Sequence, residues 1–339
     1  MRLIAIFLSL SALCLAGCID SQPNEVIVYA ALDREFSEPI LKDIGQEMNL
    51  RILPRFDVES NKTVGLANAI LAEKDRPRCD VFWNNEILHT LRLQNAGILK
   101  AWTCPAAERY PADFVSPKKD WYGFAARARV LIINTEKLPD RDQWPSSFMD
   151  LAKPKWKDKC VVARPLFGTS ATHAAVLFER LGSEDAEELY RSIASNAGVV
   201  GGNKQVAQKV AGGEYLFGLT DTDDAIIEIE NAKPVAIVFP DQAESQSGAL
   251  LIPNTLCVIN GGPNTDRAIR LVDRLLAADI EQRLAASDSA QIPVASDVKT
   301  RSRVEPENEL QIMQVDFPAA AASWDEVAKT LVEIFPAGG

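Results

Sequence analysis

The chain has 339 residues, of which 47% are hydrophobic and 24% are charged, a composition typical of a globular protein. Its formal net charge of −11 at pH 7 argues against nucleic acid or an anionic membrane surface as the main partner. The length suggests either two domains or one large domain.

An export signal is predicted at the start of the chain. Met1 and Arg2 precede an apolar run that ends at Leu15 and is too short to cross a bilayer, since a span needs about 20 apolar residues. The string Leu-Ala-Gly-Cys that ends at Cys18 resembles the lipobox of bacterial lipoproteins. This resemblance implies a signal peptide over 1–17, a lipid on Cys18 and a tether over 18–25. The lipid would anchor the protein to a membrane in the periplasm or at the cell surface. The alternative is an ordinary signal peptide with an incidental cysteine.

Strands and helices are predicted to alternate along the rest of the chain, which indicates parallel βαβ units. The first part has predicted strands at 26–31, 50–56 and 79–83 and helices at 35–47, 66–74 and 84–95. A long strand is predicted at 121–134, followed by strands at 160–164, 198–202, 216–220, 235–239 and 250–259. The remaining predicted helices are 168–181, 205–211, 223–230, 265–278, 280–286 and 323–335. Because this pattern is too long for one sheet of ordinary size, we expect two α/β lobes with a cleft between them.

Four cysteines fall in the predicted mature domain, and an exported location permits disulfides between them. They are Cys79, Cys104, Cys160 and Cys257. Four cysteines allow three sets of pairings. We expect Cys79 to pair with Cys104, since they flank one strand–helix unit. A zinc site is weakly supported, because the chain has no Cys-x-x-Cys pair and only two histidines.

Ligands of open α/β sheets bind beyond the carboxyl ends of the strands, and two polar clusters follow such ends. Gly168, Thr169 and Ser170 open a helix, where backbone N–H groups and hydroxyls can hold an anion. The alternative role of these residues is a simple helix cap. Thr222 lies within an acidic cluster formed by Asp221, Asp223 and Asp224. Its oxygens suit a hard metal ion or an ammonium group, although Thr222 or Asp223 could instead cap the next helix.

Three further strand ends complete the candidate binding site. Asp33 follows the first strand, Asn84 and Asn85 follow the third, and Asn203 follows a glycine pair. No catalytic motif is present, because the chain has no Gly-x-Ser-x-Gly elbow, no phosphate-binding loop and no His-Glu-x-x-His pair. We therefore expect a binding protein without a cofactor rather than an enzyme.

Several strings, taken together, resemble the bacterial extracellular solute-binding proteins of ABC importers, in their ferric-iron-type branch. They are 26–31, 80–86, 150–158, 165–173, 218–225, 234–242, 252–255 and 291–294. The resemblance implies the type II periplasmic-binding fold, capture of ligand by closure, and a permease and an ATPase as partners. It implies a first lobe over 26–126 completed by roughly 248–290, and a second lobe over 127–247. The C-terminal helices in 291–339 would pack on the second lobe.

The chain departs from the iron-binding members at their metal ligands. Those members use two adjacent tyrosines, where this chain has Asp223 and Asp224. Asp33 stands near their histidine position and Asn85 near their glutamate position. We expect the cargo to be a metal ion held with an anion. The alternatives are an organophosphate or aminoalkyl phosphonate as cargo, or a role as a ligand sensor rather than a transport subunit.

Overall fold

The computed structural model describes residues 24–57 and 64–336, so the predicted signal peptide and Cys18 lie outside the described residues. The strands are β1 (Glu25–Ala30), β2 (Arg51–Phe56), β3 (Val81–Asn84), β4 (Trp121–Asn134), β5 (Cys160–Ala163), β6 (Gly198–Val200), β7 (Phe217–Asp221), β8 (Val235–Val238) and β9 (Leu251–Val258). The helices are α1 (Arg34–Glu47), α2 (Val64–Ala72), α3 (Leu88–Asn95), α4 (Gly168–Leu181), α5 (Ser183–Asn196), α6 (Asn203–Ala211), α7 (Thr222–Glu230), α8 (Thr265–Leu275), α9 (Ala278–Ala286), α10 (Phe317–Ala322) and α11 (Trp324–Ile334). Among these residues, no helix is both long and apolar enough to cross a membrane.

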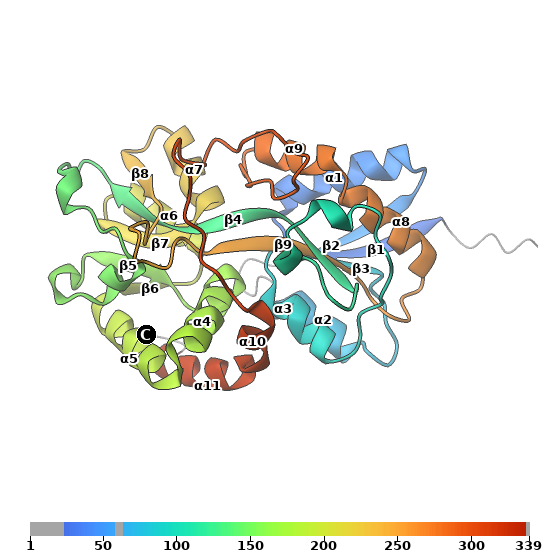
Figure 1. Cartoon of the computed structure of the whole chain (residues 1–339), viewed down its shortest axis with the longest axis horizontal. Helices are drawn as coiled ribbons and strands as arrows, with labels where there is room; N and C mark the ends of the chain where they lie inside the picture. The colour runs from blue at the N-terminus through green and yellow to red at the C-terminus, as the bar shows by residue number, and fades with distance from the viewer. Residues whose placement is uncertain (1–23, 58–63, 337–339) are drawn as a thin grey trace, which may run out of the picture.

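Two groups of parallel strands lie at opposite ends of the molecule and are joined by two long antiparallel strands (Figure 1). The strand order is β2-β1-β3-β9-β4-β7-β5-β6, and β8 also pairs with β4. β4 pairs with β9 along its first part, and from Arg129 onward it pairs with β7, with Arg129 opposite Asp221. The expected two-lobed α/β fold is confirmed. The predicted boundary at 126/127 falls inside β4, within the part of the strand that still pairs with β9.

A β-bulge interrupts β4 between Phe124 and Ala126, just before the change of partner. Ala125 has φ +40°, a left-handed conformation that is unusual for alanine. Its N–H donates to the carboxylate of buried Glu281 at 2.6 Å, and its carbonyl accepts from the side-chain amide of Asn254. Bulges bend a strand and re-aim its side chains, so this one sets the direction of the residues that follow.

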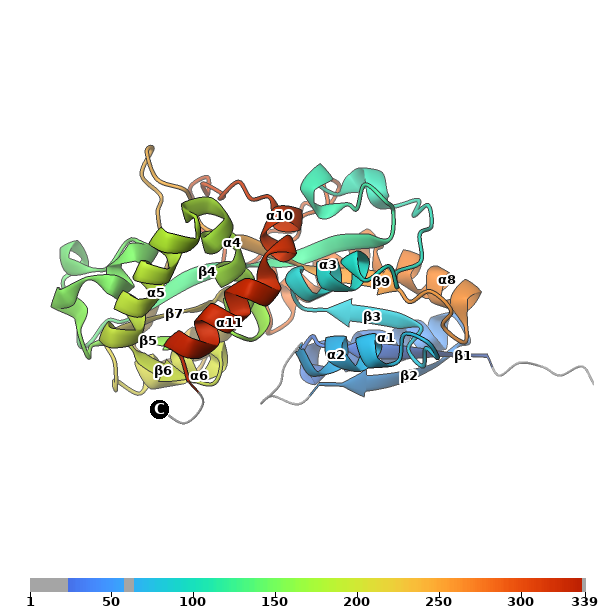
Figure 2. The ribbon, with the colours of Figure 1, turned by 90° about the horizontal axis from the view of Figure 1, so that it is seen from below.

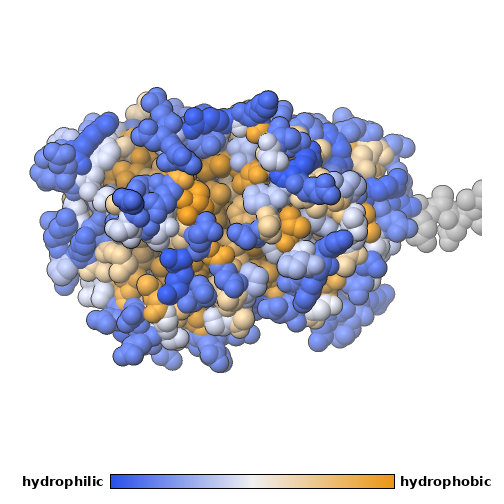
Figure 3. All heavy atoms as spheres, in the orientation of Figure 1, coloured by the Kyte–Doolittle hydropathy of each residue, from blue (hydrophilic) through white to orange (hydrophobic). Residues whose placement is uncertain are grey.

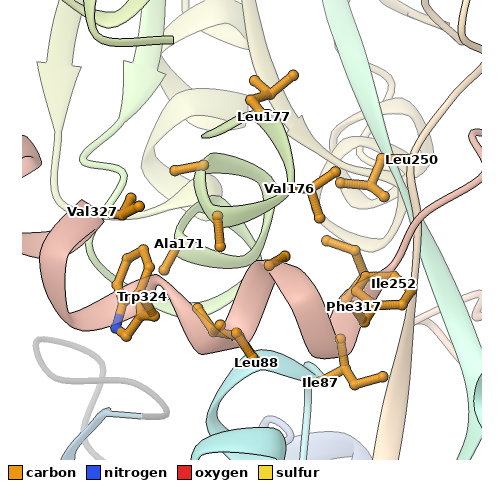
Figure 4. Close-up of a cluster of buried hydrophobic side chains, with 14 of the residues drawn as sticks. Ile87, Leu88, Ala171, Val176, Leu177, Leu250, Ile252, Phe317, Trp324 and Val327 are labelled. Atoms are coloured by element: carbon orange, nitrogen blue, oxygen red, sulfur yellow. The ribbon is translucent and has the colours of Figure 1, made fainter. Parts of the chain in front are cut away.

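The C-terminal helices join the two lobes on one side of the sheet. α10 packs against both α3 and α4, and α11 packs against α4 and α5, as Figure 2 shows. A single hydrophobic cluster continues from Ile87 and Leu88 at α3, through Phe317 of α10, to Ala171 and Val176 of α4 (Figure 4). Hydrophilic side chains cover most of the rim of the molecule, whereas hydrophobic ones show mainly near its middle (Figure 3).

The predicted disulfide is not formed, because the four described cysteines are free and buried. Cys79 belongs to the hydrophobic cluster that contains Phe82, and Cys104 belongs to the one that contains Trp83. Phe82 and Trp83 are successive residues of β3, so their side chains point to opposite faces of the sheet. The sheet therefore separates the two sulfurs. Burial raises the pKa of the Cys104 thiol to about 12.

Candidate functional site

The carboxyl ends of the strands in both lobes converge on one small cavity of about 50 Å³. The segments that follow β1, β3, β5, β6 and β7 all contribute to it. Its lining residues are Asp33, Asn85, Arg127, Ala163, Arg164, Phe167, Gly168, Thr169, Ser170, Gly201, Gly202, Asn203, Lys204, Asp221, Asp223 and Asp224. A larger groove of about 1080 Å³ runs between α1 and β2, but it contains none of the predicted site residues.

Two of the predicted site residues, Asn84 and Thr222, do not line this cavity. The amide of Asn84 is buried and donates to the carboxylate of Glu86 at 2.7 Å and to the hydroxyl of Thr90 at 3.1 Å. The hydroxyl of Thr222 accepts from the backbone N–H of Ala128 at 3.2 Å, which ties the start of α7 to β4. The other predicted ligand residues are all in the cavity lining.

Two buried arginines on β4, which were not predicted as site residues, lie beside the acidic cluster. Arg127 and Arg129 are two residues apart after the bulge, so their side chains leave the same face of the strand. They are 3% and 1% exposed, which makes them rare buried charges. The signal was present as Ala-Arg-Ala-Arg inside an otherwise apolar strand, where a charge needs a partner in the fold.

Arg129 and Asp221 form the centre of a buried hydrogen-bond network. The guanidinium Nη1 of Arg129 is 2.6 Å from Oδ1 of Asp221. Oδ2 of the same carboxylate accepts from the hydroxyl of Thr169 at 2.5 Å and from the amide of Asn203 at 2.9 Å. Ser170 donates to Asn203 at 3.1 Å and lies 3.3 Å from Nη2 of Arg129. The network thus holds the starts of α4, α6 and α7 together beneath the cavity.

Arg127 faces carboxylates from both lobes. Its Nε lies 3.4 Å from Oδ2 of Asp223. Burial alone would lower the pKa of Arg127, but the charges of Asp223, Asp221, Asp33 and Asp224 outweigh it and raise that pKa. The protein therefore supplies its own cations to the acidic cluster. From the sequence alone, a cation of the cargo was expected to neutralise these carboxylates.

The starts of α4 and α6 favour an anion. Neither helix has a side-chain cap or an acidic residue in its first turn. Gly168 has φ +53°, which suits glycine and brings the backbone to the cavity wall. The hydroxyls of Thr169 and Ser170 are engaged with Asp221 and Asn203, so the N–H groups of the helix start are the better donors for an anion.

The start of α7 favours a cation instead. Carboxylate oxygens of Asp221, Asp223 and Asp224 all lie within 4.8 Å of one another. Such an oxygen set suits hard metal ions. All five tyrosines of the chain fall within the described residues, and none of them lines the cavity. The site therefore offers no phenolate.

A buried contact outside the cavity also links the lobes. The hydroxyl of Thr172 on α4 donates to the Glu86 carboxylate at the start of α3, at 2.7 Å. Burial would raise the pKa of Glu86, but His89, Thr172 and Asn84 outweigh it and hold that pKa below its usual value. His89 Nδ1 lies 3.0 Å from the same carboxylate. This contact fixes α4, and with it the helix start that faces the cavity, against the first lobe.

His173 is a core residue rather than part of the cavity. It is 3% exposed and its ring lies 4.6 Å from that of Phe148. Burial, and then the charge of Arg129, hold the pKa of His173 well below its ordinary value. The imidazole is therefore neutral near pH 7.

Residues 89–319 match the family model described as bacterial extracellular solute-binding protein. The major ferric iron-binding protein of Neisseria meningitidis serogroup A is 24% identical over 313 residues, which are 91% of this chain and 92% of the relative. The iron-bound structure of HitA from Pseudomonas aeruginosa is similar with a TM-score of 0.82 at 20% identity, over 92% of this chain and 99% of that one. AfuA from Actinobacillus pleuropneumoniae, solved with fructose-6-phosphate, has a TM-score of 0.78 at 19% identity, over 91% of this chain and 98% of that one.

Proposed function

Because this chain belongs to the family of bacterial extracellular solute-binding proteins, we propose that it captures a hard metal ion together with an anion and delivers them to an ABC importer. The observation that carries the proposal is the pairing of two zones in one cavity. The oxygens of Asp221, Asp223 and Asp224 form a cation zone, and the uncapped starts of α4 and α6 form an anion zone. The ferric iron-binding relative from Neisseria supports a metal as the cation.

Capture of this cargo would use both lobes. Asp33 and Asn85 approach the cavity from the first lobe, whereas the acidic cluster and the α4 start belong to the second. A ligand that contacts both walls stabilises the closed arrangement and so shifts an open–closed equilibrium. β4 continues from its pairing with β9 to its pairing with β7, so it is a strand about which closure would bend the molecule.

We also propose how the protein is held near its transporter. A lipid on Cys18 would tether the domain to the outer side of a membrane, where a permease and an ATPase form the importer. The lipobox-like string supports this anchoring. Tethering keeps the binding protein close to the permease and so raises its local concentration there.

The proposal is tested by Fe³⁺ binding to the purified mature domain, with nitrilotriacetate as a competing chelator and phosphate as the anion. Asp223→Asn should weaken binding by about tenfold or more, because it removes a charged oxygen ligand. Asp142→Asn is the matched control, since Asp142 is exposed and does not line the cavity. The complex should show no phenolate–iron colour. Equal affinity in wild type and Asp223→Asn, with the fold intact, would refute the cation zone.

An organophosphate or aminoalkyl phosphonate is the second candidate cargo. Two arginines beside the uncapped helix starts favour it, because guanidinium groups recognise phosphate oxygens well. The similar structure with bound fructose-6-phosphate supports the same class. Titration with fructose-6-phosphate and with 2-aminoethylphosphonate, each without metal, separates the candidates. Tight metal-free binding of either compound, with no measurable Fe³⁺ binding, would favour this cargo over the metal.

A further inference from the structure

Arg127 lies where a cargo cation would be expected. Its guanidinium lines the cavity, and its Nε is 3.4 Å from Asp223. It interacts with acidic residues from both lobes, namely Asp33 from the first and Asp221, Asp223 and Asp224 from the second. No other buried cation in the described part of the chain both lines this cavity and interacts with all four carboxylates.

The guanidinium of Arg127 is bound less tightly by its neighbours than that of Arg129. Arg129 approaches Asp221 at 2.6 Å and also contacts Thr169 and Asn203 through the same Nη1. The buried Nε of Arg127 has no hydrogen-bond partner among the described residues, and its contact with Asp223 is long for a charge-assisted bond. The side-chain amide of Gln291 satisfies its neighbours when its oxygen and nitrogen exchange places. In that orientation its oxygen accepts from Nη2 of Arg127 at 3.1 Å. Arg129 is thus built into the scaffold, whereas Arg127 has a long ion pair that another cation could replace.

We infer that Arg127 is a resident cation of the carboxylate site, which a metal cargo must displace. This inference rests on the proposed function. A tethered guanidinium competes with every incoming ion and needs no free concentration of its own. An ion therefore binds only if its electrostatic attraction to the carboxylates exceeds that of the singly charged Arg127. A polyvalent ion meets this condition best. Arg127 is in this sense a specificity-determining residue that keeps abundant monovalent ions out of the site.

The test compares metal binding by wild type, Arg127→Gln and Arg127→Lys, with Tb³⁺ and Ca²⁺ as separate probes. Arg127→Gln removes the competing charge, so its affinity for both ions should rise by about tenfold or more. Arg127→Lys keeps a positive charge and should stay closer to wild type. Arg191→Gln is the matched control, because it removes the same charge from an exposed pair on α5 and should leave the affinity unchanged.

A measurement on the wild-type protein keeps the inference testable if Arg127→Gln fails to fold. Saturation with diamagnetic La³⁺ should shift the Nε–Hε resonance of Arg127 strongly, while that of Arg129 should move little.

Unchanged or weaker Tb³⁺ binding in a folded Arg127→Gln would overturn the inference and leave the proposed function standing. An unmoved Arg127 resonance in La³⁺-saturated protein would overturn it too. Metal binding by Arg127→Gln but not by wild type would support the resident cation and refute metal as the natural cargo. If neither protein binds any of these ions, both ideas fail.

Discussion

His173→Phe should remove one specific component of the pH dependence of stability. Burial and the charge of Arg129 hold the pKa of His173 well below the ordinary value of 6.5 that the unfolded chain retains. Below pH 6.5 the unfolded chain binds a proton at His173 that the folded chain does not bind. Neutral His173 therefore contributes fully to the free energy of unfolding above that pH, and this contribution is lost as the pH falls. While the folded imidazole stays neutral, the slope approaches about 1.4 kcal/mol per pH unit below pH 6.5.

The assay is urea unfolding of wild type and variant at several pH values in that window. Phenylalanine keeps a ring against Phe148, and any constant offset from repacking cancels because only the pH dependence is compared. The unfolding free energy of wild type should fall relative to that of the variant as the pH decreases from 7 to about 5, with a slope that approaches about 1.4 kcal/mol per pH unit. Parallel stability curves for the two proteins would show that His173 does not stay neutral in the fold.

Three further outcomes are expected. Arg129→Met leaves the Asp221 carboxylate buried without its partner and should lower the unfolding free energy by about 3–5 kcal/mol; a loss below about 1 kcal/mol in urea unfolding would contradict the network described for it. Gly168→Ala strains a backbone at φ +53° by about 1–2 kcal/mol and should weaken anion binding in calorimetry. Gly97→Ala, at φ +72° and outside the cavity lining, should cost similar stability with unchanged affinity. Cys18→Ser should move the protein from the membrane to the soluble fraction, and a serine variant that remains membrane-bound would rule out the lipid anchor.

The fold was predictable from the sequence where hydrophobic residues form a clear strand or helix pattern. The long strand β4 was predicted with the bounds that the structure has, because aromatic and β-branched residues dominate both of its ends and a Pro-rich connector precedes it. Two helices were missed for different reasons. α10 has only six residues and opens with Phe317-Pro318, a sequence too short for a helical period to show. α5 follows α4 after Gly182 alone, and a glycine at the end of a helical pattern predicts the end of the helix rather than the start of another.

The site was only partly predictable, because some of its contacts depend on long-range pairing. The strand-end rule located Gly168 and Asp221, since it needs only the order of strands. The role of Arg129 depends on β4 pairing with β7, which places it opposite Asp221. Asn85 lines the cavity, whereas the adjacent Asn84 does not. This difference follows from the alternation of side chains at the end of β3. The expected disulfide failed for the same reason, because closeness in sequence does not say which face of a sheet a cysteine occupies.

The position of β9 between β3 and β4 affects how the chain can be synthesised. A ribosome releases the N-terminus first, and β3 emerges long before its neighbour β9. Until then Val81–Asn84, buried on all sides in the finished protein, present an unpaired apolar edge that invites aggregation. The first lobe also lacks α8 and α9 until the second lobe has been made. Nascent chains truncated before Leu251 should therefore depend on chaperones more than the full-length chain does.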